Sequence, residues 1–369
     1  MKTGIFSVAA LALVCAAYAV PHPHRIHGRR IEKRDTQAFK VDIPGLVVWV
    51  DQNGKPVSTQ TKGAATAPTP PPQAPAKANA KAGGGVAVDL PLPKIPLPDL
   101  PLKPQSDAPT KGIGICYAPY RGDGNCKSAK EVNDDFSKLT DYTFIRFYGV
   151  DCEQVPKIVS AAKAHNKQVF AGIFNIKDLD KELKTLIDGA KSSWSTISTV
   201  SIGNELINSG QASVPEVVNA VNKARSVLRA AGYQGPVVTV DTFNALIAHP
   251  ELCRASDYCA ANCHAFFDPN TPAANAGDFV KNQAALVSKA AGGNKKTIIT
   301  ESGWPHSGQP NGKAIPSKSN QQMALQSLKE KFEADDDVGL FLFSAFDDAW
   351  KKDSGATFGA EKFWGMLNL

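Results

Sequence analysis

Two patterns of apolar residues alternate along the last two thirds of the chain. Short apolar runs rich in β-branched residues are typical of buried parallel strands. Between these runs apolar residues recur with a helical period, most clearly in Val214–Ala231, where Ser213 and Pro215 supply start signals. The same helical pattern occurs in Lys157–His165 and Gln321–Phe332. The strand-like runs begin near Ile113, Tyr142, Gln168, Ile197, Pro236, Tyr258, Thr297 and Gly339.

The number and spacing of the strand-like runs predict an α/β fold of the (β/α)8 TIM-barrel type. Eight strands follow one another at intervals of about 22 to 42 residues, mostly the length of a strand and a helix. Lys111–Leu369 contains 259 residues, and a (β/α)8 barrel typically takes about 250. A doubly wound open sheet also alternates strands and helices and is the alternative to the barrel.

Two glutamates stand at the ends of two predicted strands. Glu205 follows the run Ile197–Ile202 on the fourth strand, and Glu301 follows Thr297–Thr300 on the seventh, 96 residues later. Three units of about 30 residues account for that separation. A carboxylate at the carboxyl end of a barrel strand points into the mouth of the barrel, where barrel enzymes carry out their chemistry. Two facing carboxylates are the groups that break a glycosidic bond.

The first residues of the chain have the features of a secretory signal. Met1–Ala19 has one lysine, an apolar core and the small-x-small sequence Ala17-Tyr18-Ala19, and it is too short to span a membrane. We therefore assign residues 1–19 to a signal peptide and expect secretion. Lys33-Arg34 then ends a basic pro-segment, residues 20–34, at a dibasic processing site. An ordinary solvated pair of basic residues is the alternative.

The region between the pro-segment and the barrel has two parts. In residues 35–63, Gly45–Lys55 predicts a strand and an Asn-Gly turn, hence a short hairpin-like segment. A single hairpin does not fold stably alone. Residues 64–110 are rich in Pro, Ala, Lys and Gly and predict an extended, flexible linker. Residues 111–369 form the predicted catalytic domain.

The basic charge of the chain belongs mostly to the predicted signal and pro-segment. These residues carry six of the 41 basic side chains and one of the 35 acidic ones, so their removal lowers the net charge from +6 to +1. The remaining chain gives no electrostatic reason to expect nucleic-acid binding.

Six cysteines remain after the signal peptide, and an even number in a secreted protein predicts disulfides. Six cysteines allow 15 pairings, and the sequence does not choose among them. A Cys116–Cys126 loop and a link within Cys253–Cys263 are local and therefore plausible. No CxxC pairs with a second metal-binding motif, so we expect no zinc and no cofactor. The six are Cys116, Cys126, Cys152, Cys253, Cys259 and Cys263.

Five motifs in order along the barrel resemble glycoside hydrolase family 17, and more narrowly its secreted fungal cell-wall glucanases and glucan transferases. Val48–Gly54 also resembles the short N-terminal segment of fungal soluble cell-wall mannoproteins that carry this domain. The resemblance implies a retaining enzyme that acts on β-1,3-glucan in the fungal cell wall. We expect a monomer with no membrane span. The motifs are Gly112–Gly114, Arg146–Cys152, Gly203–Glu205, Thr300–Pro305 and Phe346–Lys351.

The resemblance implies distinct roles for the two glutamates. Glu205 would be the general acid/base, with a pKa raised by partial burial and by the nearby charge of Glu301. Glu301 would be the ionised nucleophile that forms a covalent glycosyl-enzyme. Retention requires the carboxyl groups to lie about 5–5.5 Å apart, whereas inversion requires roughly 6.5–9.5 Å. Asn204 resembles the asparagine of the family that holds the sugar 2-OH.

Further candidates for substrate binding stand near other strand ends. The two tyrosines among them could hydrogen-bond a sugar or Glu301, or belong to the core, and the histidine could orient Glu301 or serve a structural purpose. The two tryptophans have flat rings suited to stacking on pyranoses, and the remaining Asp and Lys could hold sugar hydroxyls. These candidates are Tyr117, Tyr148, His264, Trp304, Trp350, Asp347 and Lys351.

Two functional classes remain open. The first is an enzyme that cuts β-1,3-glucan or transfers the cut end to another glucan. The second is a wall-bound structural or adhesive mannoprotein whose barrel binds glucan with little turnover. The paired glutamates favour the enzyme, whereas the linker and the hairpin-like segment fit a wall protein better. A Glu301→Gln variant separates the two classes.

Overall fold

The computed structural model describes residues 39–43, 46–50, 56–61, 112–333, 339–353 and 355–367. The predicted signal peptide, pro-segment and linker lie outside the described residues, as does the Asn53-Gly54 turn. The described residues belong to two separate units, one with the first three strands and one with all the later elements.

The N-terminal unit is a three-stranded antiparallel sheet in the order β1-β2-β3. Its strands are β1 (Phe39–Ile43), β2 (Leu46–Val50) and β3 (Pro56–Thr61). The strand predicted within Gly45–Lys55 is confirmed as β2, but the segment has one strand more than a hairpin. Phe39–Ile43 alternates apolar and polar residues, the period of a half-buried strand. Three strands are the smallest number expected for an independently stable sheet.

The larger unit is a closed barrel of eight parallel strands in the order β10-β11-β4-β5-β6-β7-β8-β9. This topology confirms the predicted (β/α)8 barrel and excludes the open sheet. Each strand starts within two residues of its predicted position. The strands are β4 (Ile113–Cys116), β5 (Phe144–Arg146), β6 (Gln168–Ile173), β7 (Ile197–Asn204), β8 (Val237–Thr242), β9 (Cys259–Asn262), β10 (Thr297–Ser302) and β11 (Leu340–Leu342).

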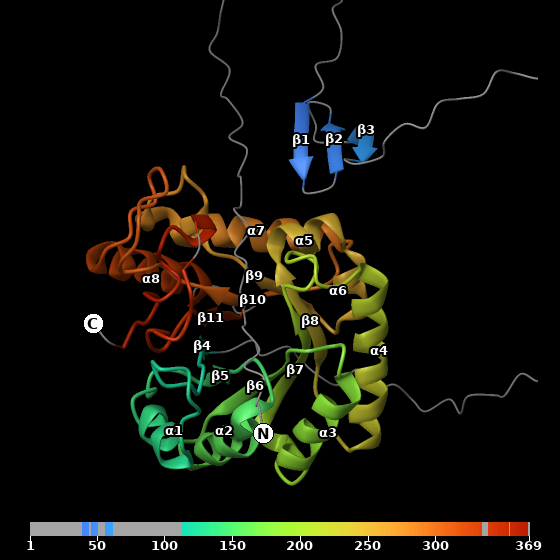
Figure 1. Cartoon of the computed structure of the whole chain (residues 1–369), viewed down its shortest axis with the longest axis vertical. Helices are drawn as coiled ribbons and strands as arrows, with labels where there is room; N and C mark the ends of the chain where they lie inside the picture. Colours follow the sequence, from blue (N-terminus) through green and yellow to red (C-terminus); the bar gives the residue numbers. More distant parts are fainter. Residues whose placement is uncertain are drawn as a thin grey trace, which may run out of the picture. The chain divides into compact units, whose positions relative to one another are not determined.

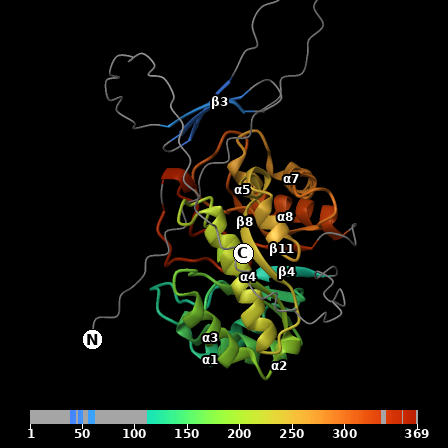
Figure 2. The same ribbon diagram turned by 90° about the vertical axis from the view of Figure 1, so that its right-hand side faces the viewer.

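Helices surround the strand ring on its outside (Figures 1 and 2). The three helices predicted from the sequence are confirmed as α2, α4 and α8, and β8 is followed by two short helices instead of one. Capping boxes begin α1 at Ser128 and α4 at Ser213, where each serine pairs with a glutamate three residues later. The helices are α1 (Ala129–Phe136), α2 (Gln154–Ala164), α3 (Leu179–Ala190), α4 (Val214–Ala230), α5 (Phe243–Ala248), α6 (Glu251–Ala255), α7 (Ala276–Ala290) and α8 (Lys318–Glu333).

Large aromatic side chains fill the interior of the barrel. Phe341 on β11 packs edge-on against Phe170 on β6, with ring centroids 5.3 Å apart. Gly114 on the neighbouring strand makes this possible, because a Cβ atom there would lie 2.2 Å from the Phe341 ring. The interior is therefore packed solid, so the chemistry is confined to the rim at the carboxyl ends of the strands.

Two disulfides join elements of the barrel unit, Cys126–Cys152 and Cys253–Cys259. The second lies within the predicted interval Cys253–Cys263. The proposed Cys116–Cys126 pairing is wrong, because Cys116 ends β4 inside the barrel, where its thiol donates to the carbonyl of Thr300 at 3.4 Å. Cys126 lies instead in the exposed loop after β4. Among the described residues, no helix has the length and apolar character needed to cross a bilayer.

Candidate active site

Glu301 lies near the end of β10 and is buried, with 7% of its surface exposed. Its Oε1 accepts a hydrogen bond from Arg146 Nη1 at 2.7 Å, and its Oε2 faces His264 Nε2 at 3.3 Å. Burial by itself raises the pKa of this carboxyl group, but the charge of Arg146 and the His264 contact outweigh burial and lower the pKa to about 2. Glu301 is therefore ionised at neutral and moderately acidic pH.

Glu205 is the residue that follows β7, and it adopts a left-handed backbone conformation with φ 52°. The residue is only partly exposed. Asn262 Nδ2 donates to its Oε1 at 2.9 Å, and Asn208 Nδ2 lies 3.4 Å from its Oε2. Removal from water, then the negative charge of Glu301, raises the pKa of Glu205 to about 8. Glu205 is therefore protonated at neutral and acidic pH.

A hydrogen-bonded network links the two glutamates. Arg146 Nη2 donates to Asn204 Oδ1 at 2.8 Å, and Asn262 Nδ2 donates to the same oxygen at 3.2 Å. Asn262 Oδ1 in turn accepts from Thr300 Oγ1 at 2.8 Å. The positions of Glu205 and Glu301 are thus coupled through side chains at the ends of β5, β7 and β9.

Arg146 and Asn262 were not among the sequence-predicted site residues. Arg146 is 1% exposed and Asn262 is 2% exposed, and both are the last residues of their strands. The sequence signal that could have found them is a charged or amide residue at the end of an otherwise apolar strand. Such a residue lies at the barrel mouth, and when it is buried it needs polar partners there.

Asp241 on β8 is a third residue that the sequence did not single out. Its carboxylate accepts from the backbone N–H groups of Ile207 at 2.9 Å, Asn208 at 3.2 Å and Thr242 at 2.8 Å. Two of these groups belong to the turn that follows Glu205. Asp241 therefore holds that turn, and its negative charge also contributes to the raised pKa of Glu205.

Two predicted candidates contact Glu301 or its partner Arg146. His264 contacts its Oε2 and is enclosed by Phe267, Phe343 and Trp364. The ring of Tyr148 lies beneath the guanidinium of Arg146 at 4.5 Å. The buried Tyr148 hydroxyl lies beside the Cys116 thiol, and in the described part of the chain the buried His264 Nδ1 has no hydrogen-bond partner.

Three further candidates lie in the loop after β11. Asp347 accepts from His306 Nε2 at 3.0 Å and from the Gly365 backbone at 2.8 Å. Lys351 Nζ lies 3.2 Å from Asp348 and 3.5 Å from Glu361. These contacts arrange charged groups at the rim.

Lys351 is also linked electrostatically to the nucleophile candidate. Burial lowers the pKa of Lys351, but the charges of Asp348, Glu361 and Glu301 raise it overall. Its neighbour Trp350 is partly exposed, and its Nε1 donates to Asp348 Oδ1 at 3.1 Å. The loop therefore holds a cation whose charge reaches Glu301 and an aromatic ring next to that cation.

The structure contradicts two of the predicted substrate contacts. Trp304 is fully buried, packs on Phe266 and donates its Nε1 to the carbonyl of Ile315, so neither side of its ring is open to a sugar. Tyr117 is 1% exposed, and its hydroxyl donates to Asp135 on α1 at 2.7 Å. Tyr117 therefore points into the packing between β4 and α1, whereas Trp304 is enclosed by the loops that follow β9 and β10.

The described residues contain no cluster of three or more His, Cys, Asp or Glu side chains arranged to bind a metal ion. One carboxyl group is held as the base form and the other as the acid form, which is the division of labour that glycoside cleavage requires.

Paired carboxyl groups after the fourth and seventh strands of a (β/α)8 barrel define the class of barrel glycoside hydrolases. Comparison with known proteins agrees: residues 114–365 match the family described as the BtgE/BtgC glycoside hydrolase domain. The chain therefore belongs to the BtgE/BtgC glycoside hydrolase family.

Known proteins with similar sequences come from fungi. The probable family 17 glucosidase SCW4 of Saccharomyces cerevisiae is 47% identical over 257 residues, which cover 69% of this chain and 65% of the relative. The cell surface mannoprotein MP65 of Candida albicans is 46% identical, with 69% of this chain and 66% of that protein covered. The predicted resemblance to glycoside hydrolase family 17 is confirmed. The match spans just under two thirds of the length of these relatives.

A solved structure shares the fold. The glycoside hydrolase family 17 β-1,3-glucanosyltransferase of Rhizomucor miehei superposes with a TM-score of 0.59 at 21% identity. The superposition covers 70% of this chain and 93% of that one. At this identity the similarity supports the barrel architecture alone.

Proposed function

We propose that this protein is a retaining glycosidase that cleaves β-1,3-glucan by double displacement and passes the cut chain to water or to another glucan. The observation that carries the proposal is the opposite shift of two carboxyl pKa values at the mouth, about 2 for Glu301 and about 8 for Glu205. Related fungal proteins named as family 17 glucosidases support the choice of substrate class.

In the first step, Glu301 attacks the anomeric carbon of the sugar. The bond between that carbon and the glycosidic oxygen breaks, a glycosyl ester forms on Glu301, and the proton of Glu205 passes to the leaving oxygen. The leaving chain departs as an alcohol. In this proposal Arg146 and His264 orient the Glu301 carboxylate for attack, and Asn204 holds the sugar 2-OH.

In the second step, Glu205, now ionised, removes a proton from water or from a sugar hydroxyl. The oxygen of that acceptor attacks the anomeric carbon, the ester bond breaks, and Glu301 returns to its carboxylate form. Two inversions leave the anomeric configuration unchanged. Tyr148, Asp347, Trp350 and Lys351 are proposed to bind the glucan chain at the mouth.

The cellular setting is part of the same proposal. The signal peptide at residues 1–19, the pro-segment at 20–34 and the linker at 64–110 would deliver the catalytic domain, residues 111–369, as a secreted monomer to the cell wall. The names of the relatives, one a cell surface mannoprotein, are consistent with that destination.

Product analysis tests the proposal directly. The purified chain is incubated with reduced laminari-oligosaccharides, beside Glu205→Gln and Glu301→Gln variants, and the anomeric configuration of the new products is read by proton NMR. We expect β-products from the wild type and turnover reduced at least a thousandfold in both variants. Products longer than the substrate would identify a transferase. Binding without turnover by the wild type would contradict the proposal and leave a glucan-binding structural wall protein.

A further inference from the structure

Two aromatic rings meet at the rim of the barrel without being buried in it. Tyr120, in the loop after β4, and Trp350, in the loop after β11, pack with ring centroids 4.9 Å apart at 57°. Both residues are partly exposed. The two strands that carry these loops are neighbours in the ring.

Hydrogen bonds fix the orientation of both rings. The Tyr120 hydroxyl donates to Asp151, at 2.8 Å from Oδ2, and accepts from Gln154 Nε2 at 2.8 Å. Gln154 is itself 1% exposed and also donates to Asp151 Oδ1. Trp350 is held through its Nε1 by Asp348. Partly exposed rings with every polar atom engaged have little freedom to rotate, which lowers the entropy cost of binding a ligand.

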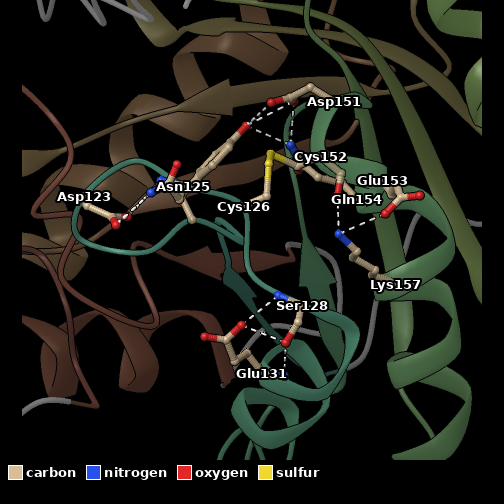
Figure 3. The surroundings of a disulfide bond; sticks show 11 residues. Asp123, Asn125, Cys126, Ser128, Glu131, Asp151, Cys152, Glu153, Gln154 and Lys157 are labelled. Atoms are coloured by element: carbon tan, nitrogen blue, oxygen red, sulfur yellow. Dashed lines mark hydrogen bonds and ion pairs between the residues drawn. A yellow bond between two sulfur atoms is a disulfide. The ribbon is translucent and has the colours of Figure 1, made fainter.

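The Cys126–Cys152 disulfide fastens the loop of Tyr120 to the turn after β5. Figure 3 shows this disulfide beside Asp151 and Gln154. Cys126 also forms an antiparallel backbone bridge with Tyr120. On the other side, Cys152 has a left-handed backbone, φ 54°, and its carbonyl accepts from Lys157 Nζ at 2.8 Å. The covalent link thus joins both halves of the support beneath the Tyr120 ring.

The position of these rings relative to Glu205 is set by the strand order. In the ring of eight, β11 lies four strands from β7, the largest separation possible, and β4 lies three strands from it. The general acid donates its proton to the leaving oxygen, so the leaving chain lies on the Glu205 side of the mouth. The rings lie on the other side, beside Lys351, whose charge interacts with Glu301.

We propose that Tyr120 and Trp350 form an outer subsite that stacks on a glucosyl unit of the chain retained on Glu301, held in place by the Cys126–Cys152 disulfide. The equatorial hydroxyls of β-glucose leave flat C–H surfaces that pack on aromatic rings. This inference rests on the proposed function, since it assigns the part of the glucan that the rim binds. It predicts that substrates long enough to reach the rim are cleaved more efficiently than shorter ones.

The test compares kcat/KM over a series of reduced laminari-oligosaccharides of increasing length. In the wild type kcat/KM should rise once the chain reaches the rim. Trp350→Ala and Tyr120→Ala should each remove about fivefold to tenfold of kcat/KM for these long substrates, mainly through KM, with a smaller effect on the shortest substrate cleaved. Trp350→Phe, with a smaller ring, should lie between the wild type and Trp350→Ala.

A second tryptophan–tyrosine pair supplies the matched control. Trp194 packs on Tyr233 with centroids 5.2 Å apart at 48°, but it precedes β7 and so lies at the opposite end of the barrel. Trp194→Phe should lower the melting temperature without altering the dependence on substrate length. An equal loss at every length in Trp350→Ala and Trp350→Phe would overturn the subsite and leave the two rings as a structural contact.

The disulfide is tested in the same assay. In a Cys126→Ser/Cys152→Ser background, kcat/KM for long substrates should fall, and the further effect of Tyr120→Ala should shrink to less than twofold. Cys253→Ser/Cys259→Ser should leave the effect of Tyr120→Ala unchanged. A full Tyr120→Ala effect without Cys126–Cys152 would overturn the bracing role. Absence of turnover by the wild type on every substrate would instead refute the proposed function, so the two failures are distinguishable.

Discussion

Replacement of Arg146 by methionine should remove the main support of the Glu301 carboxylate. Arg146 is buried and its Nη1 lies 2.7 Å from Glu301 Oε1. The pKa of Glu301 is about 2, against an ordinary value of 4.5. A difference of about 2.5 units, at 1.36 kcal/mol each, corresponds to about 3 kcal/mol of preference for the ionised form. Without the cation, burial should raise the pKa above 4.5.

The sign of the pH dependence follows from the lowered pKa. The stability contributed by Glu301 is fully present above pH 4.5 and is lost as the pH falls through 2. At pH 6 it amounts to about 3 kcal/mol, and at pH 3 to about 1 kcal/mol. Arg146→Met should therefore be strongly destabilised at pH 6, and the deficit should shrink by about 2 kcal/mol at pH 3.

Activity should report the same change independently. At pH 3 the ionised fraction of Glu301 should fall from about nine tenths to at most about three hundredths, a loss of about thirtyfold in kcat/KM from ionisation alone. Urea unfolding at pH 6 and pH 3, and the acid limb of kcat/KM, are the two assays. Arg121→Met is the control, because Arg121 pairs with Glu131 on the surface and should change neither. An acid limb in Arg146→Met that coincides with the wild type would refute this reasoning.

Four further outcomes are expected. The pH profile of kcat/KM should be bell-shaped, with limbs near about 2 and about 8, since Glu301 must be ionised and Glu205 protonated; an alkaline limb below pH 6 would contradict it. Asp241→Asn should move the alkaline limb to lower pH, because a negative charge near Glu205 is lost, and an unmoved limb in the folded variant would argue against that coupling. Glu205→Ala should regain turnover with azide on a substrate that has a good leaving group, giving a β-glycosyl azide by NMR; an α-azide would exclude double displacement. Loss of the Cys126–Cys152 disulfide, which spans 26 residues, should lower the free energy of unfolding by about 3 kcal/mol, and an unchanged urea midpoint would show that this loop contributes nothing to the unfolded-state entropy.

The barrel could be predicted from the sequence because its strands are buried on both sides. Ile197–Ile202 is mostly β-branched and Thr297–Thr300 entirely so, a pattern that can be recognised without knowing which strands pair. Strand β1 (Phe39–Ile43) of the N-terminal sheet was not predicted. It is short, and it pairs with β2, a separate segment of the chain, so its own sequence does not reveal the pairing.

The candidate site could be predicted only where its residues sit in recognisable motifs. Glu205 and Glu301 end strands with strong signals. Asn262 ends a strand but belongs to no recognisable motif, and its importance comes from contacts with residues 57 and 58 positions earlier. The prediction for Trp304 was wrong although the residue lies in a recognisable motif. The motif suggested an exposed ring, whereas Trp304 is buried by packing on Phe266. That packing depends on the folded arrangement of aromatic side chains.

Asn262 has a consequence for where the acidic proton of Glu205 can reside. Arg146 and Thr300 both donate to Asn262 Oδ1, so the amide cannot rotate by half a turn without setting its N–H groups against other donors. Its Nδ2 therefore donates to Glu205 Oε1 at 2.9 Å, whereas Oε2 accepts only the longer 3.4 Å contact from Asn208 Nδ2. The oxygen that accepts the shorter bond is the poorer place for a proton, so the proton resides on Oε2. A neutral amide thus fixes the side of the carboxyl group from which hydrogen is delivered to the scissile bond.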